Sequence, residues 1–260
     1  MWIALGAVAL TLTFYVLVND AINFKVLAFI FSSTLFTYNF QRLLKIRMKI
    51  NLSGDRVDWI KKNEIFIYII TLTSFLFTIY FSFIFLSKIW ILLLLSGFVS
   101  FFYVWKVPLL KGKNLRDLPG IKIYLIAFVW VLICVVMPTI LSQTTKLDEV
   151  TGLIALALFA FIVSITIPFD IRDVKLDDIS KKTIPQLIGV KSSVYISIIL
   201  LIFSQIILQS VLPFNIGIWV FTFIGSFVLY LSKNKQSELF FSGIIDGLFV
   251  LQIGLIFLFK

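Results

Sequence analysis

Residues 89–95 read Ile-Trp-Ile-Leu-Leu-Leu-Leu, seven apolar side chains with no polar residue among them. A strand of a transmembrane β-barrel alternates apolar and polar residues, so this run does not fit a barrel. An α-helix satisfies its own backbone hydrogen bonds, as a chain surrounded by lipid must. The stretch therefore predicts a helix that lies in a membrane.

Apolar blocks of this kind fill the rest of the chain. Of its 260 residues 60% are hydrophobic and its mean hydropathy is +1.07, whereas soluble domains are about 45–50% apolar. About 20 apolar residues cross a bilayer core. We therefore expect an all-α polytopic membrane protein, with residues 1–260 as one domain and nine transmembrane helices near residues 2–18, 24–43, 64–86, 90–105, 121–142, 150–169, 193–212, 215–232 and 239–259.

The basic residues alternate between the gaps that separate these blocks. Nineteen of the 23 Lys and Arg residues lie in every second gap, within 42–62, 106–122, 172–191 and 233–235. Since cytoplasmic loops carry the Lys/Arg excess, the pattern predicts a cytoplasmic N-terminus and a bacterial cytoplasmic membrane as the location. The net charge of +10 thus indicates topology, with membrane lipids and no nucleic acid as partners. The long cytoplasmic loops are the expected working face.

Two residue types limit the chemistry. The chain has no histidine, which excludes histidine-based zinc sites and histidine acid–base catalysis. Its single cysteine, Cys134, cannot form a disulfide within the chain.

Three aspartates at the predicted inner end of the sixth block form the sharpest motif. Asp170, Asp173 and Asp177 are spaced i, i+3, i+7, which places them on one face if the helix continues. Carboxylates gathered in this way suit Mg²⁺, which proteins hold with carboxylate oxygens and substrate phosphates. The alternative is a helix end whose acids and bases solvate each other.

At this point the sequence resembles a known family. The pattern Asp170-x-x-Asp173-x-x-x-Asp177, followed by Thr183-x-Pro185 and Gly189, looks like the second aspartate-rich motif of the UbiA superfamily of intramembrane prenyltransferases. The segment Tyr103-x-x-Lys106-x-Pro108 resembles another of its motifs. The resemblance implies nine helices around a central cavity open to lipid. It also implies Mg²⁺-assisted transfer of an isoprenyl chain from its diphosphate to a lipophilic, aromatic acceptor.

The chain departs from the family at the inner end of the second block. The family has an Asn-Asp-x-x-Asp-x-x-x-Asp type motif there, whereas residues 38–47 keep Asn39 but contain no aspartate. Arg42, Lys45 and Arg47 bring positive charge to the same stretch. Either these cations bind diphosphate oxygens directly in place of one metal, or the chain has lost transferase chemistry.

The leading hypothesis is accordingly a prenyltransferase. Its catalytic and Mg²⁺-binding residues would be Asp170, Asp173 and Asp177, with the diphosphate bound by Asn39, Arg42, Lys106, Arg116 and Lys122. The rival hypothesis is a non-catalytic lipid-binding relative or a transporter. Asp246, inside the ninth block between Gly243 and Gly247, keeps that rival open, because an ionisable residue at this depth marks either a polar pathway or a contact between helices.

Overall fold

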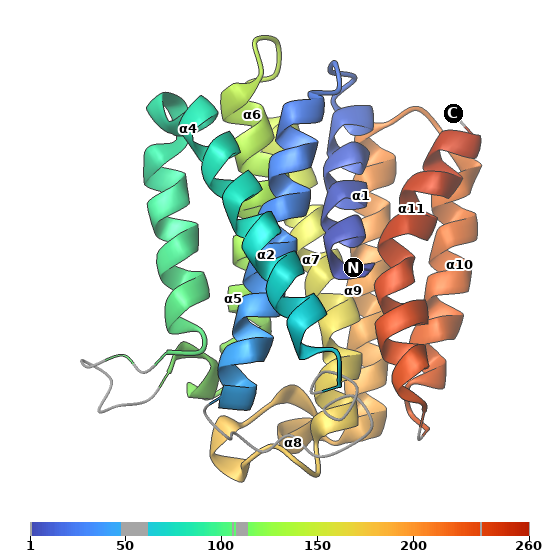
Figure 1. Cartoon of the computed structure of the whole chain (residues 1–260). Coiled ribbons are helices and arrows are strands. Elements are labelled where there is room, and N and C mark those ends of the chain that lie inside the picture. The colour runs from blue at the N-terminus through green and yellow to red at the C-terminus, as the bar shows by residue number, and fades with distance from the viewer. Residues whose placement is uncertain (1, 48–61, 106, 108–113, 235, 260) are drawn as a thin grey trace.

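The computed structural model describes residues 2–47, 62–105, 107, 114–234 and 236–259, and every regular element among them is a helix (Figure 1). The longer elements are α1 (Trp2–Leu17), α2 (Phe24–Arg47), α4 (Glu64–Phe102), α5 (Lys122–Val131), α7 (Glu149–Asp173), α9 (Val190–Val211), α10 (Ile216–Leu231) and α11 (Asp246–Leu258). The shorter ones are the 3₁₀ turns η2 (Leu115–Asp117) and η4 (Ile179–Lys181), the π turns η3 (Leu132–Val136) and η5 (Phe240–Ile245), and the helices α6 (Met137–Leu141) and α8 (Ile184–Ile188).

Helix α4 is two antiparallel segments joined by a sharp bend. Ile89 has φ −125° and ψ 15°, which is outside the helical range. Figure 1 shows the chain rising along the first part of α4 and descending along the second. The bend follows directly after Ser87-Lys88, where the sequence predicts a break. With α4 counted as two, and with η3–α6 and η5 joined to their helices, the described residues contain the nine predicted helical segments.

The loops alternate between the two ends of the bundle as predicted. The turns after α1, α6 and α9 lie at one end, and the described segments 114–121, 174–189 and 232–239 lie at the other (Figure 1). We call the second end the basic end, after the Lys and Arg residues of those segments. Its cytoplasmic placement stays a prediction.

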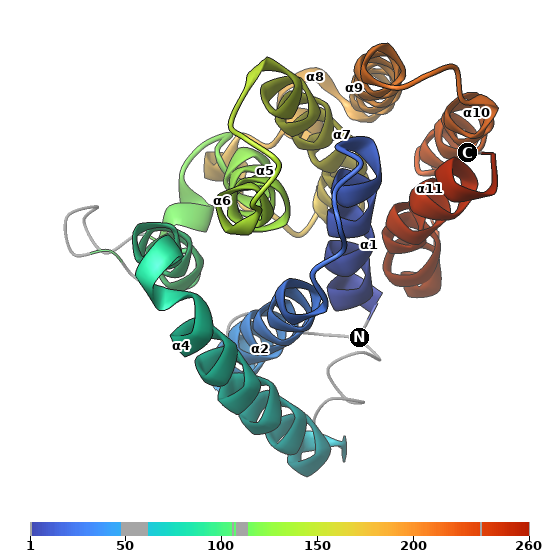
Figure 2. The same cartoon turned by 90° about the horizontal axis from the view of Figure 1, so that it is seen from above.

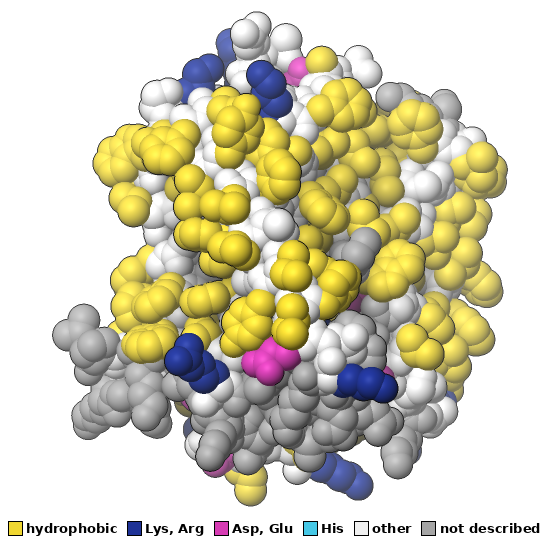
Figure 3. Space-filling model, viewed as in Figure 1, with side chains coloured by type: hydrophobic (Ala, Val, Ile, Leu, Met, Phe, Trp, Pro, Cys, Tyr) yellow, Lys and Arg dark blue, Asp and Glu magenta, His cyan; other side chains and the backbone are white. Residues whose placement is uncertain are grey.

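Several helices have the length and composition of membrane spans. Five segments of the described chain are long and apolar enough to cross a bilayer, and α1 and α10 are apolar but shorter. Large apolar side chains are exposed all along the bundle, such as Phe83 at 73% and Phe223 at 78%. Figure 3 shows them as a broad band on one face, with charged side chains near its two ends. Lipid is the natural cover for such a band.

The helices follow one another around a closed ring. Packing contacts link α4 to α2, α2 to α1, α1 to α11, α11 to α10, α10 to α9, α9 to α7 and α7 to α5, and α5 returns to α4 (Figure 2). One apolar core runs through the ring and includes the fully buried Phe161 and Phe221. Between α7 and α9, the hydroxyls of Ser164 and Ser197 each donate to the other residue's carbonyl, at 2.8 and 2.7 Å. Small polar residues of this kind let membrane helices approach closely. The central cavity implied by the family resemblance stays a prediction.

Candidate functional site

Helix α7 carries Asp170 and Asp173, and it runs beyond the predicted block 150–169 but stops before Asp177. Its last residue is Asp173, and the carbonyl of Asp173 accepts hydrogen bonds of 2.8 Å from the backbone N–H groups of Leu176 and Asp177. The chain therefore turns before Asp177. The expectation that one continuous helix carries Asp170, Asp173 and Asp177 on one face is wrong, because tight turns at 174–177 redirect the last carboxylate.

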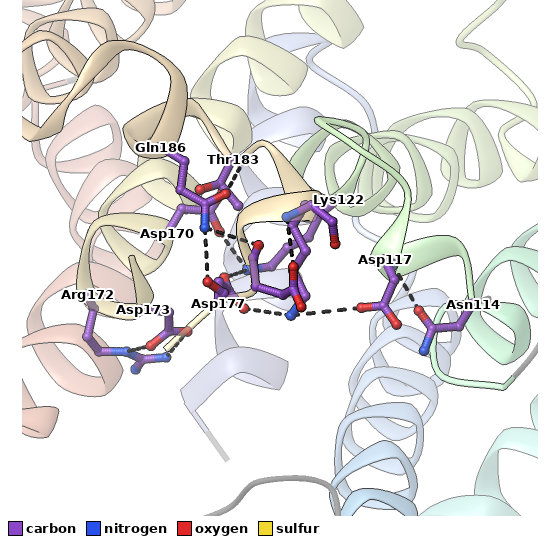
Figure 4. Close-up of polar contacts among 12 residues, drawn as sticks. Asn114, Asp117, Lys122, Asp170, Arg172, Asp173, Asp177, Thr183 and Gln186 are labelled. Atoms are coloured by element: carbon purple, nitrogen blue, oxygen red, sulfur yellow. Dashed lines mark hydrogen bonds and ion pairs between the residues drawn. The ribbon is translucent and has the colours of Figure 1, made fainter. Parts of the chain in front are cut away.

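Lys122 lies between two of the three carboxylates (Figure 4). It is the first residue of α5, and its Nζ is 2.5 Å from Oδ1 of Asp170 and 3.7 Å from Oδ2 of Asp177. The three side chains are 12%, 2% and 6% exposed, respectively. A buried ion pair is costly to break from one side, because the remaining charge loses its only compensation. The ammonium of Lys122 therefore holds the start of α5 against the end of α7.

A second lysine joins the same group from the other side. Nζ of Lys181 is 2.7 Å from Oδ1 of Asp177, which is four residues earlier in the chain. The same Nζ is 3.8 Å from Oδ1 of the half-exposed Asp117. We call Arg116, Lys122, Asp170, Asp177 and Lys181 the charge cluster. It combines the two basic-end loops that precede α5 and follow α7.

Backbone contacts fasten those loops to each other. Gly120, whose φ of +69° suits glycine, donates its N–H to the carbonyl of Lys181 at 2.9 Å. Gln186 in α8 donates from Nε2 to the carbonyls of Asp177 and Asp178, and its Oε1 accepts the Thr183 N–H at 2.9 Å. The loop after α7 is therefore folded tightly against the start of α5.

A small cavity lies inside the cluster. Arg116, Lys122, Asp170, Lys181 and Thr183 are among its lining residues, and its volume is about 10 Å³. That is space for about one water molecule. Three buried polar atoms at the cluster, Nε of Arg116, Oγ1 of Thr183 and Oδ2 of Asp177, have no hydrogen-bond partner among the described residues. The cavity is thus lined by groups that would bind a polar occupant.

The surroundings of Asp177 keep its carboxyl group charged. Burial opposes ionisation of the Asp177 carboxyl, but the hydrogen bond from Lys181 and the charge of Lys122 outweigh burial, and the pKa of Asp177 is lowered. Tyr103, directly after α4, lies within electrostatic reach of the cluster, and burial raises the pKa of its phenol. Asp177 is therefore a carboxylate at neutral pH, and Tyr103 is a neutral hydroxyl.

Asp173 belongs to a different group. Its carboxylate accepts two hydrogen bonds from the neighbouring Arg172, at 2.7 Å from Nε and 3.0 Å from Nη2. Arg172 also lies 3.3 Å from Oε2 of Glu238 and stacks over the rings of Phe169 and Phe241 at 5.4 and 5.3 Å. This arrangement fastens the end of α7 to the segment that enters α11. It leaves Asp173 apart from Asp170 and Asp177.

The remaining predicted site residues are not part of the charge cluster. Neither Asn39 nor Arg42, both in α2, is among the residues that line the cavity. The guanidinium carbon of Arg42 lies 4.7 Å from the centre of the Tyr38 ring. Lys106 lies outside the described residues. Of the five predicted diphosphate contacts, the structure brings Arg116 and Lys122 together.

Sequence reasoning noted Lys181 beside the carboxylates but left it out of the predicted site residues, and it missed the Arg172–Glu238 pair. A signal existed for Lys181, which stands four residues after Asp177, a spacing that pairs opposite charges. No comparable signal exists for Arg172 and Glu238, which are 66 residues apart.

Buried polar residues also occur inside the bundle. Nε2 of Gln252 in α11 donates to Oε1 of Gln205 in α9 at 3.1 Å, and both side chains are fully buried. Asp246, 7% exposed, is the first residue of α11 and directly follows the π turn η5. The helix interiors are therefore more polar than the apolar blocks suggest.

Among the described residues no three Asp, Glu, Cys or His side chains are grouped so that they could hold a metal ion. Comparison of the chain with known protein families, with characterised proteins and with solved structures finds no match.

Proposed function

We propose that this chain is a membrane prenyltransferase that moves an isoprenyl group from its diphosphate to a lipophilic, aromatic acceptor at the basic end of the bundle. The observation that supports the proposal is the charge cluster, in which Arg116, Lys122 and Lys181 gather around one small cavity. These cations lie where the polar loops join the apolar helices. An isoprenyl diphosphate has two matching parts, because its diphosphate would bind the cations and its hydrocarbon chain would lie against the apolar helices.

The proposed reaction needs positive groups that stabilise the leaving diphosphate, and the charge cluster contains such groups. The C–O bond between the isoprenyl carbon and the diphosphate breaks, and the electron pair stays on the diphosphate. The allylic cation forms a new bond with the acceptor, which releases a proton. Fixed cations stabilise the charge that builds on the leaving diphosphate. Arg116 is the first candidate, because its buried Nε–H has no hydrogen-bond partner among the residues that the structure describes.

The residues present do not fit a Mg²⁺ ion held by three carboxylates. Arg172 occupies both oxygens of Asp173, and the Lys122 ammonium stands between Asp170 and Asp177. We therefore derive no step through a metal, although bound Mg²⁺ stays a prediction of the family resemblance.

The site must open before it can bind a diphosphate. Its cavity of about 10 Å³ holds one water, which is far smaller than a diphosphate group. Opening requires the loop before α5 to move away from the loop after α7, with loss of the hydrogen bond from Gly120 to Lys181. Substrate binding should therefore accelerate hydrogen exchange at the Gly120 amide.

A second candidate function rests on the buried polar residues. Gln205, Asp246 and Gln252 lie in or at the ends of bundle helices, as polar residues of a transporter or a lipid-binding protein would. Such a protein would bind a polar lipid without breaking it. The assay below separates the two candidates, because only the transferase releases diphosphate.

The test uses the full chain, purified in detergent or nanodiscs, with radiolabelled isoprenyl diphosphates of several lengths and a panel of aromatic acceptors. Parallel reactions contain Mg²⁺ or EDTA. We expect labelled product together with released diphosphate, and a fall of about tenfold or more in Arg116→Ala. Lys175→Ala, which removes an exposed cation from the loop after α7 at the same end of the bundle, is the control. Binding of the donors without release in any reaction would refute the transferase and support the second candidate.

A further inference from the structure

Asp170 and Asp177 are arranged around a central positive charge in the way that the carboxylates of a metal site are arranged around a metal ion. Two carboxylates from separate turns face one cation, and both are almost completely buried. A divalent ion held by one or two carboxylates has the same arrangement. In this chain the cation is the ammonium of Lys122, and a second ammonium, that of Lys181, binds the other oxygen of Asp177. The two ammonium groups together carry the charge of one Mg²⁺ ion.

We infer that Lys122 takes the place of a divalent metal between Asp170 and Asp177, so that this site binds its anionic ligand through side-chain cations and without Mg²⁺. The identity of the ligand as a diphosphate rests on the proposed function. The exclusion of the metal does not, because it follows from the position of Lys122 alone.

The donors required for an anion are present in the cluster. An ammonium has three N–H groups, and Lys122 uses one of them in its short bond to Asp170. Arg116 and Thr183 line the same cavity, and within the part of the chain that the structure describes the buried Nε–H of Arg116 and the hydroxyl of Thr183, a residue that is 4% exposed, have no hydrogen-bond partner. Asp170 and Asp177 then act as positioning residues that fix the two lysines, while the lysines and Arg116 contact the ligand.

The charge at α2 agrees with this exchange of metal for lysine. The stretch 38–47 has three basic residues and no acidic one, so it offers no carboxylate ligand for a second ion. Asp173 is engaged by Arg172 at both oxygens. The carboxylates at the end of α7 are thus each neutralised by a side-chain cation of the same protein.

The first experiment removes the lysine and measures metal binding alone. We expect the wild-type chain in detergent to bind Mn²⁺ weakly, and Lys122→Ala to bind it about tenfold more tightly or better, because the freed carboxylate pair becomes a cation site. The double variant Lys122→Ala/Asp170→Asn should lose this increase in Mn²⁺ affinity. The control Lys175→Ala should bind Mn²⁺ as weakly as the wild type does. Equal Mn²⁺ binding by the wild type and Lys122→Ala would overturn the inference. Monodispersity on a sizing column and the melting temperature establish that each variant is folded.

The second experiment measures binding of radiolabelled pyrophosphate and needs no variant for its main result. Wild-type affinity should change by less than about twofold between EDTA and Mg²⁺, since a side-chain site does not depend on the metal. Lys122→Ala should lose about tenfold in EDTA and recover when Mn²⁺ is added, because the metal then replaces the missing ammonium.

The outcomes separate the two proposals. A wild type that binds pyrophosphate only with Mg²⁺ overturns the inference but leaves the transferase proposal standing. A wild type that binds pyrophosphate in neither condition overturns the diphosphate part of the inference together with the proposed function. The double variant Lys122→Met/Asp170→Asn, which leaves no unpaired charge on Asp170, should bind Mn²⁺ no more tightly than the wild type does and should lose pyrophosphate binding. Tighter Mn²⁺ binding than the wild type, or pyrophosphate binding at wild-type affinity, would contradict the inference.

Discussion

Replacement of Lys122 by methionine should destabilise the protein far more than is usual for the first residue of a helix. Asp170 is 2% exposed and lies 2.5 Å from Nζ of Lys122, so the variant leaves a buried carboxylate without its cation. Breaking a buried ion pair from one side costs about 3–5 kcal/mol. For a chain of this size that lowers the melting temperature by roughly 6–20 °C.

The double variant distinguishes a coupled pair from two independent side chains. Lys122→Met/Asp170→Asn removes both charges, and replacement of a whole buried pair is often close to neutral. It should therefore recover about 2 kcal/mol or more of the loss in Lys122→Met. Asp117→Asn is the control, because that carboxylate is 41% exposed and 3.8 Å from Lys181, and exposed pairs contribute less than about 1 kcal/mol.

Intrinsic fluorescence during heating in detergent measures all three variants, since the chain has six tryptophans. Asp170→Asn alone is measured in the same way, to complete the comparison. The reasoning is refuted if Lys122→Met has the same melting temperature as Asp117→Asn, or if the double variant is as unstable as Lys122→Met and Asp170→Asn added together.

Three further predictions concern the rest of the bundle. Gly217→Ala should cost about 3 kcal/mol, because its Cβ would lie 2.2 Å from the backbone oxygen of Leu255, whereas Gly254→Ala meets nothing within 4 Å and should melt like the wild type. Asp20 accepts hydrogen bonds from three hydroxyls of the loop after α6, which outweigh burial and lower its pKa from 3.8 to about 2. Its stabilising effect is therefore present above about pH 3.8 and is lost as the pH falls toward 2, and Asp20→Asn should flatten that part of a pH–melting curve. Ser197→Ala should cost about 1 kcal/mol in a melting assay, the contribution of its hydrogen bond to Ser164.

The helices could be predicted from the sequence because each one is an apolar block with polar ends. Even the reversal inside α4 has a local signal, since Ser87 and Lys88 interrupt an otherwise continuous apolar run. Lipid-facing helices of this kind need few specific contacts, so composition alone indicates them. Apolar blocks do not reveal how such helices are ordered around the ring, because many neighbours satisfy the same pattern.

The candidate site was harder to predict, for a physical reason. Asp170, Asp173 and Asp177 share a face only if the helix continues, and the sequence that follows Asp173 is compatible with a helix or a turn. In the structure these carboxylates are in contact with distant residues, such as Lys122, which is 48 positions before Asp170. Sequence spacing describes neighbours along one helix. It contains no information about a cation that arrives from another loop.

The charge of Lys122 has two interpretations, one from membrane topology alone and one from the anion site proposed above. As one of nineteen basic residues on the same side, it is accounted for by topology alone. A lysine needed only for topology would remain in water, because burial of an ammonium is costly unless it is paired. Lys122 is instead 12% exposed and paired with a carboxylate that is 2% exposed. A chain that places both charges inside a protein interior, beside an unpartnered arginine N–H, retains them at an energetic cost that topology does not require. Binding of an anion at this position is a function that would account for that cost.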